Sequence, residues 1–277
     1  MRQLQLGILL VFTASSLSRP GFCENGKPGD ANEALDPLYS TPFVYQNTGH
    51  GVGPSFSMQY ELGYGSRESR NFTQEGIEQG VRGRFQILDW LAIEGFGGLV
   101  VDARRTETKG YAGSFEVIGR LLNQNRHHIN LDLGGGYIYD YRGDHVPRVR
   151  LTLGWAHKKF DIALGSLVEI PVGNAGRDEA DVVTTLAFSY AFKDWLRIGW
   201  ETGFEDIEGF FESEESEGGA KTIFGPTFAI IATKHIFLKL NTAGIYAFTS
   251  NQRFEGNRTK PDALGFLGRL ILGWTFY

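Results

Sequence analysis

From Ser55 to the end, most of the chain alternates between apolar and polar side chains with a period of two. In residues 55–65, SFSMQYELGYG, an apolar side chain stands at every second position from Phe56 to Tyr64, with Ser, Gln, Glu or Gly between them. A β-strand sends successive side chains to opposite faces, whereas a helix would scatter both sets around its circumference. The alternation therefore predicts strands that have one apolar and one polar face.

The same pattern predicts about twelve strands, each long enough to cross a bilayer with the ~9–11 tilted residues that a crossing takes. We expect these strands near residues 54–66, 76–87, 91–102, 113–122, 128–141, 147–156, 160–170, 182–192, 196–206, 222–232, 236–248 and 265–277.

The connections between the expected strands alternate between short and long. The short ones include residues 88–90, 157–159, 193–195 and 233–235, and the long ones include 67–75, 103–112, 171–181, 207–221 and 249–264. A membrane barrel has short turns on the periplasmic side and longer loops outside, and an even number of strands puts both termini with the short turns. This order predicts an all-β fold, a closed antiparallel transmembrane β-barrel that follows an up-and-down meander.

Aromatic residues should form girdles at both membrane interfaces of such a barrel. The residues near the short-turn ends are Trp90, Trp155, Phe160, Phe192, Trp195, Trp274 and Phe276, and those near the long-loop ends are Tyr64, Tyr139, Tyr141, Tyr246 and Phe248.

The composition narrows the class of protein. The 277 residues are enough for one large domain, and 13% aromatic residues argue against disorder. The formal net charge of −5 does not favour a nucleic-acid partner. No segment after the N-terminus has the ~18 uncharged apolar residues of a transmembrane helix. A mean hydropathy of −0.21 still suits a membrane barrel, because lipid-facing and interior residues alternate.

The N-terminus predicts export. Arg2, an apolar core at residues 6–14 and the small residues that follow have the order of a secretory signal peptide. Cleavage could fall before Leu17 or before Glu24, and we favour a signal peptide at residues 1–23. Cys23, the only cysteine, would then be removed, and the residues before it do not resemble a lipobox. We expect an irregular periplasmic segment at residues 24–53 and the barrel at residues 54–277.

The last residues, 266–277, have the sequence FLGRLILGWTFY. This stretch resembles the final-strand signal of bacterial outer-membrane proteins, in which alternating apolar residues end in a terminal aromatic. Leu270, Leu272, Trp274 and Phe276 carry the alternation, whereas Tyr277 extends one residue beyond that register. The resemblance is to a general, porin-like architecture over residues 54–277. It implies a bacterial outer-membrane barrel, and members with twelve strands include solute channels, a phospholipase and proteases.

The polar strand faces should line the barrel interior with charges of both signs. They can be interpreted as the wall of a water-filled channel, or as paired charges that fill a narrow interior. The candidate interior residues are Glu61, Glu78, Arg82, Arg84, Glu94, Glu116, Arg120, Asp132, Arg150, Glu169, Arg197, Glu201, Lys239 and Arg269, together with Asp140 and Asp161.

The sequence predicts no enzyme, no catalytic residue, no metal ligand and no cofactor. A hydrolase of this architecture needs a nucleophile and a base near the outer rim, and His145 is the only histidine expected there. No serine near His145 fits a hydrolase motif. An acidic-pair protease would need two carboxylates that converge at the outer rim, and Asp102, Asp140 and Glu205 are expected near that height, as charges are in any such barrel. The acidic residues 205–217 predict a solvated loop more readily than a calcium site, because like charges repel.

These patterns together predict a passive channel for small polar solutes in the outer membrane of a Gram-negative bacterium. A structural or surface-interaction barrel with a plugged interior is the alternative, and an outer-membrane hydrolase is the third. The expected partners are outer-membrane lipid and lipopolysaccharide, small polar solutes, and the barrel-assembly machinery through the C-terminal strand, with no nucleic acid.

Overall fold

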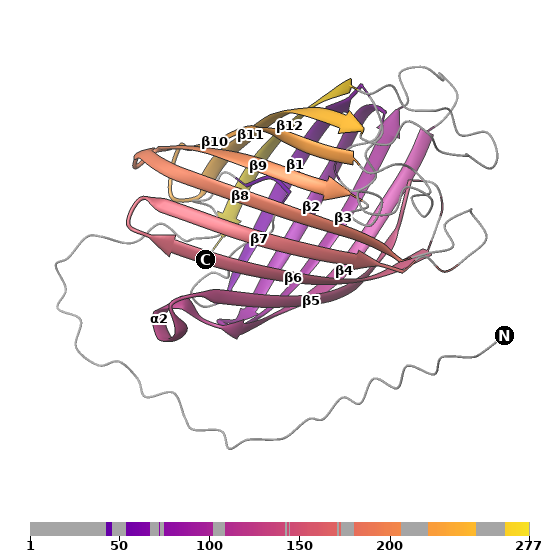
Figure 1. The fold of residues 1–277 in the computed structure, drawn as a ribbon. Coiled ribbons are helices and arrows are strands. Elements are labelled where there is room, and N and C mark those ends of the chain that lie inside the picture. Colours follow the sequence, from indigo (N-terminus) through magenta and orange to yellow (C-terminus); the bar gives the residue numbers. More distant parts are fainter. Residues whose placement is uncertain are drawn as a thin grey trace, which may run out of the picture. The chain divides into compact units, whose positions relative to one another are not determined.

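The computed structural model forms a closed barrel of twelve antiparallel strands, in which each strand pairs with its neighbours in the sequence and β1 pairs with β12 (Figure 1). It describes residues 43–45, 54–66, 72, 75–101, 109–141, 143, 145–170, 172, 180–205, 221–247 and 264–276. The elements are β1 (Ser55–Gly65), β2 (Gly76–Leu88), β3 (Leu91–Val101), β4 (Lys109–Leu122), α2 (Gln124–His127), β5 (Asn130–Tyr139), β6 (His145–His157), β7 (Phe160–Glu169), β8 (Asp181–Lys193), β9 (Leu196–Glu205), β10 (Lys221–Ile231), β11 (Ile236–Ala247) and β12 (Leu264–Phe276).

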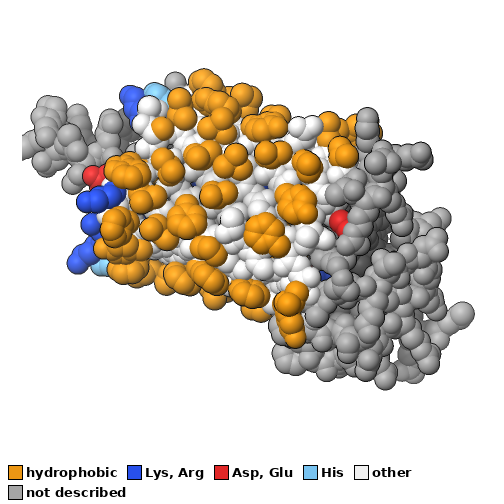
Figure 2. Space-filling view, turned by 90° about the horizontal axis from the view of Figure 1, so that it is seen from above, with side chains coloured by type: hydrophobic (Ala, Val, Ile, Leu, Met, Phe, Trp, Pro, Cys, Tyr) orange, Lys and Arg blue, Asp and Glu red, His pale blue; other side chains and the backbone are white. Residues whose placement is uncertain are grey.

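Each strand turns its apolar face outward. In β1 the side chains of Phe56, Met58 and Tyr60 are exposed, whereas Ser57 and Glu61 on the alternate face are buried. Hydrophobic side chains accordingly cover the visible outer wall, and Lys, Arg and His gather at one end (Figure 2). The exposed apolar face and buried polar face reverse the arrangement of a soluble sheet, as is typical of a barrel whose outer face contacts hydrocarbon.

The barrel closes between the first and last strands. Phe56 lies opposite Phe276, and this register continues to Gly65 opposite Leu267. The rings of Phe56 and Phe276 stack with centroids 6.1 Å apart. Closure leaves no strand edge unpaired along this seam, which a barrel in hydrocarbon requires.

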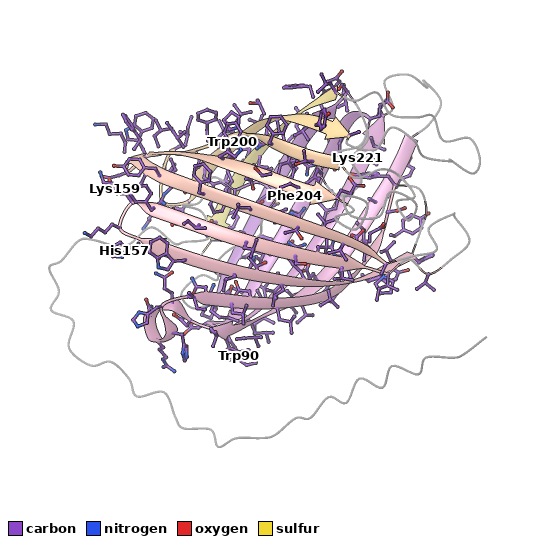
Figure 3. All side chains as sticks on the ribbon, in the orientation of Figure 1. Trp90, His157, Lys159, Trp200, Phe204 and Lys221 are labelled. Carbon is purple, nitrogen blue, oxygen red and sulfur yellow. The ribbon has the colours of Figure 1, made fainter. Side chains whose placement is uncertain are left out.

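The strand ends joined by the short turns after β2, β6, β8 and β10 gather at one end of the barrel, and the strand ends that flank the long connections lie at the other (Figure 1). His157 and Lys159 lie at the short-turn end, and Lys221 lies at the long-loop end (Figure 3). One pair departs from the expected alternation, because the β4–β5 connection at residues 123–129 is longer than the β5–β6 connection at 140–144. The additional residues form α2, whose cap Asn123 accepts a hydrogen bond from the Asn125 amide at 2.9 Å.

The predicted strands and the all-β barrel are confirmed, with boundaries that shift by a few residues. The largest shift is in β4, which begins at Lys109 rather than residue 113, and α2 was not predicted. The expected signal peptide and most of the expected periplasmic segment 24–53 lie outside the described residues. Among those described, no helix is both long and apolar enough to cross a membrane.

Most of the aromatic residues expected at the strand ends are exposed on the outside, including Trp90, Trp195 and Tyr64. Tyr141 is an exception, because its hydroxyl donates to Glu78 Oε1 at 3.0 Å on the inner face. The reason is that β5 ends at Tyr139, so the strand alternation no longer fixes the direction of Tyr141. Phe248 lies outside the described residues.

Candidate functional site in the barrel interior

The strands bring the predicted charged residues together on the inner wall. All fourteen candidate interior residues are buried or half-buried, on the strand faces that alternate with the exposed apolar side chains. Asp161 is also buried, and Asp140 is half-buried just after β5. Buried charges need partners, and the described ones form several connected groups.

The first group joins four adjacent strands around the closing seam. Arg82 on β2 donates to Glu61 on β1 and to Glu94 on β3, both at 2.6 Å. Arg269 on β12 donates to the other oxygen of Glu61 and to Glu78, both at 3.1 Å. Each arginine therefore bridges two carboxylates, and the chain of contacts fixes the registers of β12, β1, β2 and β3 on the inner side.

The second group lies on β4 and β6. Arg148 and Arg150 both donate to Glu116 Oε2, at 3.1 and 2.9 Å, and Glu116 is only 1% exposed. Gly134 on β5 leaves the space for this carboxylate, since a Cβ there would stand 2.2 Å from Glu116 Oε1. Two guanidinium groups thus share one carboxylate, and Glu169 on β7 lies opposite Arg148 in the strand register.

Other pairs lie nearer the two ends. At the short-turn end, Arg120 contacts Asp132 at 3.0 Å, and Asp161 accepts hydrogen bonds from Arg197 and, at 3.0 Å, from Ser189. At the long-loop end, Lys221 stands 3.9 Å from Glu205.

The Tyr141 hydroxyl is part of the inner wall at the long-loop end. Burial and the neighbouring Glu78 carboxylate raise the pKa of this hydroxyl above its ordinary value. Tyr141 therefore stays a neutral hydrogen-bond donor to Glu78 over the physiological pH range.

Residues 43–45 of the expected periplasmic segment lie against the inner wall. The backbone amides of Val44 and Tyr45 donate to Glu201 Oε1 at 2.8 and 3.0 Å. Lys239 Nζ donates to the carbonyl of Phe43 at 3.3 Å, and the Tyr45 hydroxyl donates to Asn241 Oδ1 at 3.3 Å. Side chains from β9 and β11 therefore hold a short, bent piece of chain inside the barrel.

Phe72, from the β1–β2 connection, is also inside. It is 2% exposed and packs on an apolar patch of the inner wall, formed by Val183, Ile223, Ala243, Ile245 and Leu267. Its ring contacts Tyr45 edge-on, with centroids 5.2 Å apart. Gly203 leaves space for the ring, because a Cβ there would stand 2.2 Å from Phe72 Cζ.

The histidines do not assemble a hydrolase site within the described part of the chain. His145 is exposed, and its ring contacts Tyr137 and Tyr139. His127, His128, His157 and His235 are exposed at the short-turn end, as expected of solvated turns. Asp102 lies outside the described residues, and Glu205 is near Lys221. Within the described ranges, no three His, Cys, Asp or Glu side chains converge as a metal site.

Comparisons with known proteins identify the architecture. No protein-family model matches the chain, and no curated protein matches its sequence. The structure is similar to the KdgM porin in complex with disordered oligogalacturonate, with a TM-score of 0.54 and 9% identity over 80% of this chain and 99% of that one. It is also similar to the NanC porin, with a TM-score of 0.52 and 12% identity over 78% and 98%. The chain has the porin-like barrel architecture of outer-membrane proteins, and identities this low show the fold alone.

Sequence reasoning missed three parts of the site. Arg148 shares a strand face with Arg150, two residues away, so the alternation could have identified it as an interior residue. The apolar triplet 43–45 stands out within a polar segment, but nothing in it predicts contact with Glu201. The apolar patch departs from the expectation of a uniformly polar interior, and its partner Phe72 lies in a loop without periodicity.

Proposed function

We propose that the protein is an outer-membrane channel that passes small polar solutes passively along its charged inner wall. The observation that carries this proposal is the set of buried charged side chains on the inner wall of a closed barrel with an apolar exterior. Charges of both signs on a pore wall can replace part of the hydration of a polar solute and bias the sign of the ions that pass.

The proposed location is the outer membrane of a Gram-negative bacterium, after export by the signal peptide at residues 1–23. Fold likeness to two porins supports this location. The short-turn end would face the periplasm, with Trp90 and Trp195 at the lipid headgroups, and the long loops would meet lipopolysaccharide. The final strand would be the segment that the barrel-assembly machinery receives.

Planar-bilayer conductance of the refolded barrel tests the channel, with an Arg82→Ala/Arg84→Ala variant beside it. Loss of two positive charges from the inner wall should make the pore more selective for cations. The reversal potential measured in a salt gradient should shift accordingly. Lys158→Ala/Lys159→Ala is the matched control, because it removes the same charge from an exposed turn. A barrel that folds but passes no current, or a selectivity that both variants change equally, would contradict the proposal.

A structural or surface-interaction barrel is the second candidate function. It is favoured by the charge pairs across the inner wall and by the presence of residues 43–45 and Phe72 inside. In this case the long loops would form the interaction surface. The conductance experiment would then give no current from the wild-type protein.

A further inference from the structure

We propose that the inner wall formed by β9, β11 and β12 is a binding site for a short peptide segment. The chain's own residues 43–45 occupy this site as a releasable plug. Release of these residues opens this half of the interior to solute, a consequence that rests on the proposed channel function. Residues 43–45 are hereafter called the plug.

Charged side chains of the wall bind the backbone of the plug. One carboxylate oxygen of Glu201 accepts from two consecutive amides, and Lys239 donates to the carbonyl just before them. Glu201 is 2% exposed, and its second carboxylate oxygen accepts from Asn241 Nδ2 at 3.4 Å. Hydrogen bonds between a charged side chain and backbone groups are stronger than neutral ones, and the two amides that share one oxygen lie where the chain bends.

The side chains of the plug fit different parts of the wall. Phe43 packs on Ala163 and Ala187, two small residues of β7 and β8 that leave space for its ring. Val44 packs beside Phe237 and Ile271 of β11 and β12. The three plug residues therefore contact strands from β7 around to β12.

Phe72 and Arg269 hold the plug from a second direction. The Tyr45 ring lies edge-on to the Phe72 ring. The Arg269 guanidinium stands 5.6 Å from the centre of the Tyr45 ring. Arg269 also donates to the carbonyl of Phe72 at 2.8 Å. A loop residue and the plug thus share one arginine, which couples the position of the plug to the β1–β2 connection.

The chemistry of the site allows release. A carboxylate and an ammonium group bind the plug backbone, and an amide binds the Tyr45 hydroxyl. Water solvates all three groups well once the plug leaves. A purely apolar site would be costly to expose to water. The polar contacts therefore make the plug separable from the wall, whereas Phe72 remains on its apolar patch.

Thiol labelling tests the plug without depending on current. The probe is Ala187→Cys, a position that Phe43 covers and that is fully buried in the wild type, in a Cys23→Ser background that removes the only native thiol. A water-soluble methanethiosulfonate reagent is added to the folded barrel, with and without Glu201→Gln or Phe72→Ala. Glu116→Gln is the matched control on the opposite wall, where its partners are Arg148 and Arg150.

We expect Glu201→Gln to raise the labelling rate about tenfold or more, as the loss of charge-assisted hydrogen bonds implies, and Glu116→Gln to leave it unchanged. Phe72→Ala should raise it as well. Equal rates in all backgrounds would overturn the proposal. Acceleration by Phe72→Ala alone would overturn the assignment of residues 43–45 as the plug.

Conductance of the same proteins separates the two proposals. Faster labelling in Glu201→Gln with no current from any variant would support the plug and contradict the channel. Faster labelling with a larger current in Glu201→Gln would support both. Current from every variant with uniform labelling would support the channel and overturn the plug.

Discussion

At the scale of single residues, small side chains on the inner wall decide where large ones fit. Added Cβ atoms at Gly273 and Gly203 would stand 2.0 and 2.2 Å from the rings of Phe237 and Phe72. The Phe237 ring on β11 lies over Gly273 of the neighbouring strand β12, whereas the Phe72 ring reaches Gly203 of β9 from the β1–β2 connection. The inner surface is therefore packed closely in places, although its composition is polar.

This packing predicts the effect of Gly273→Ala. The added methyl group must displace the ring of Phe237, which is 1% exposed, and overpacking of this kind typically costs about 1–3 kcal/mol. The free energy of unfolding from urea titration should fall by that amount. Gly97→Ala is the control, because nothing lies within 4 Å of a Cβ there. Recovery of stability in Gly273→Ala/Phe237→Ala would attribute the loss to this contact, and equal stability of both single variants would refute it.

A second residue-scale prediction concerns Arg82. Replacement by Met keeps the volume but leaves Glu94 without its 2.6 Å partner and Glu61 with one arginine fewer. Arg82 is about one-fifth exposed, which reduces the loss from the ~3–5 kcal/mol of a fully buried pair to about 2 kcal/mol. Urea titration measures the loss, and Arg82→Met/Glu94→Met should recover part of it. No recovery would mean that Arg82 acts through its other contacts.

The sequence predicted which charged residues are interior, but not how they pair. Glu61 and Arg82 could be assigned to the inner wall because the pleat sends every second side chain to one face. Their contact depends on the register of β1 with β2, and the contact of Glu61 with Arg269 depends on closure with β12. Such long-range registers are not encoded in the alternation of any one strand.

At the scale of elements, α2 shows what a period-two pattern cannot predict. The helix has four residues, and the αL residue His128 ends it with a φ of 64°. Its first residue, Gln124, accepts from the Ala156 amide at 2.8 Å and so joins the β4–β5 connection to the end of β6. Residues 123–129 thus replace a tight turn with a small capped helix that contacts a strand two positions along the barrel.

His128 is the C-cap of α2 and has a positive φ, which glycine adopts without steric cost. We therefore expect His128→Gly to leave the free energy of unfolding unchanged or to raise it by up to about 1 kcal/mol. His127→Gly, inside the helix, should destabilise by about 1 kcal/mol and provides the contrast. Heat-induced unfolding followed by gel mobility measures both. A loss of stability in His128→Gly would show that the imidazole makes a contact worth more than the backbone strain.

At the scale of the whole molecule, one side of the interior differs from the other. Charge pairs dominate from β1 to β6, whereas the wall from β7 to β12 combines an apolar patch with the groups that bind residues 43–45. The sequence predicted the barrel and its polar interior but not this division. The residues that fill the second side come from segments outside the strands, which have no periodic pattern.

The final strand predicts a difference between assembly in cells and refolding in detergent. If the assembly machinery receives the C-terminal strand, Phe276→Ser should lower the amount of folded barrel in cell envelopes while the purified variant still refolds. Phe160→Ser is the control, since Phe160 is also an exposed aromatic at the short-turn end. Equal losses in cells for both variants would contradict a special role of the last strand.

The pairing of β1 with β12 has a consequence for how the chain reaches its folded state. Phe56 and Phe276 meet across the seam, although almost the whole barrel separates them along the chain. Contacts between residues so distant in sequence form slowly, because the entropy of ordering the intervening loop is lost before the contact forms. Until β12 is made, β1 exposes a strand edge that can pair with another chain. The chain is therefore most vulnerable to aggregation after its first strand is made and before its last strand pairs with it.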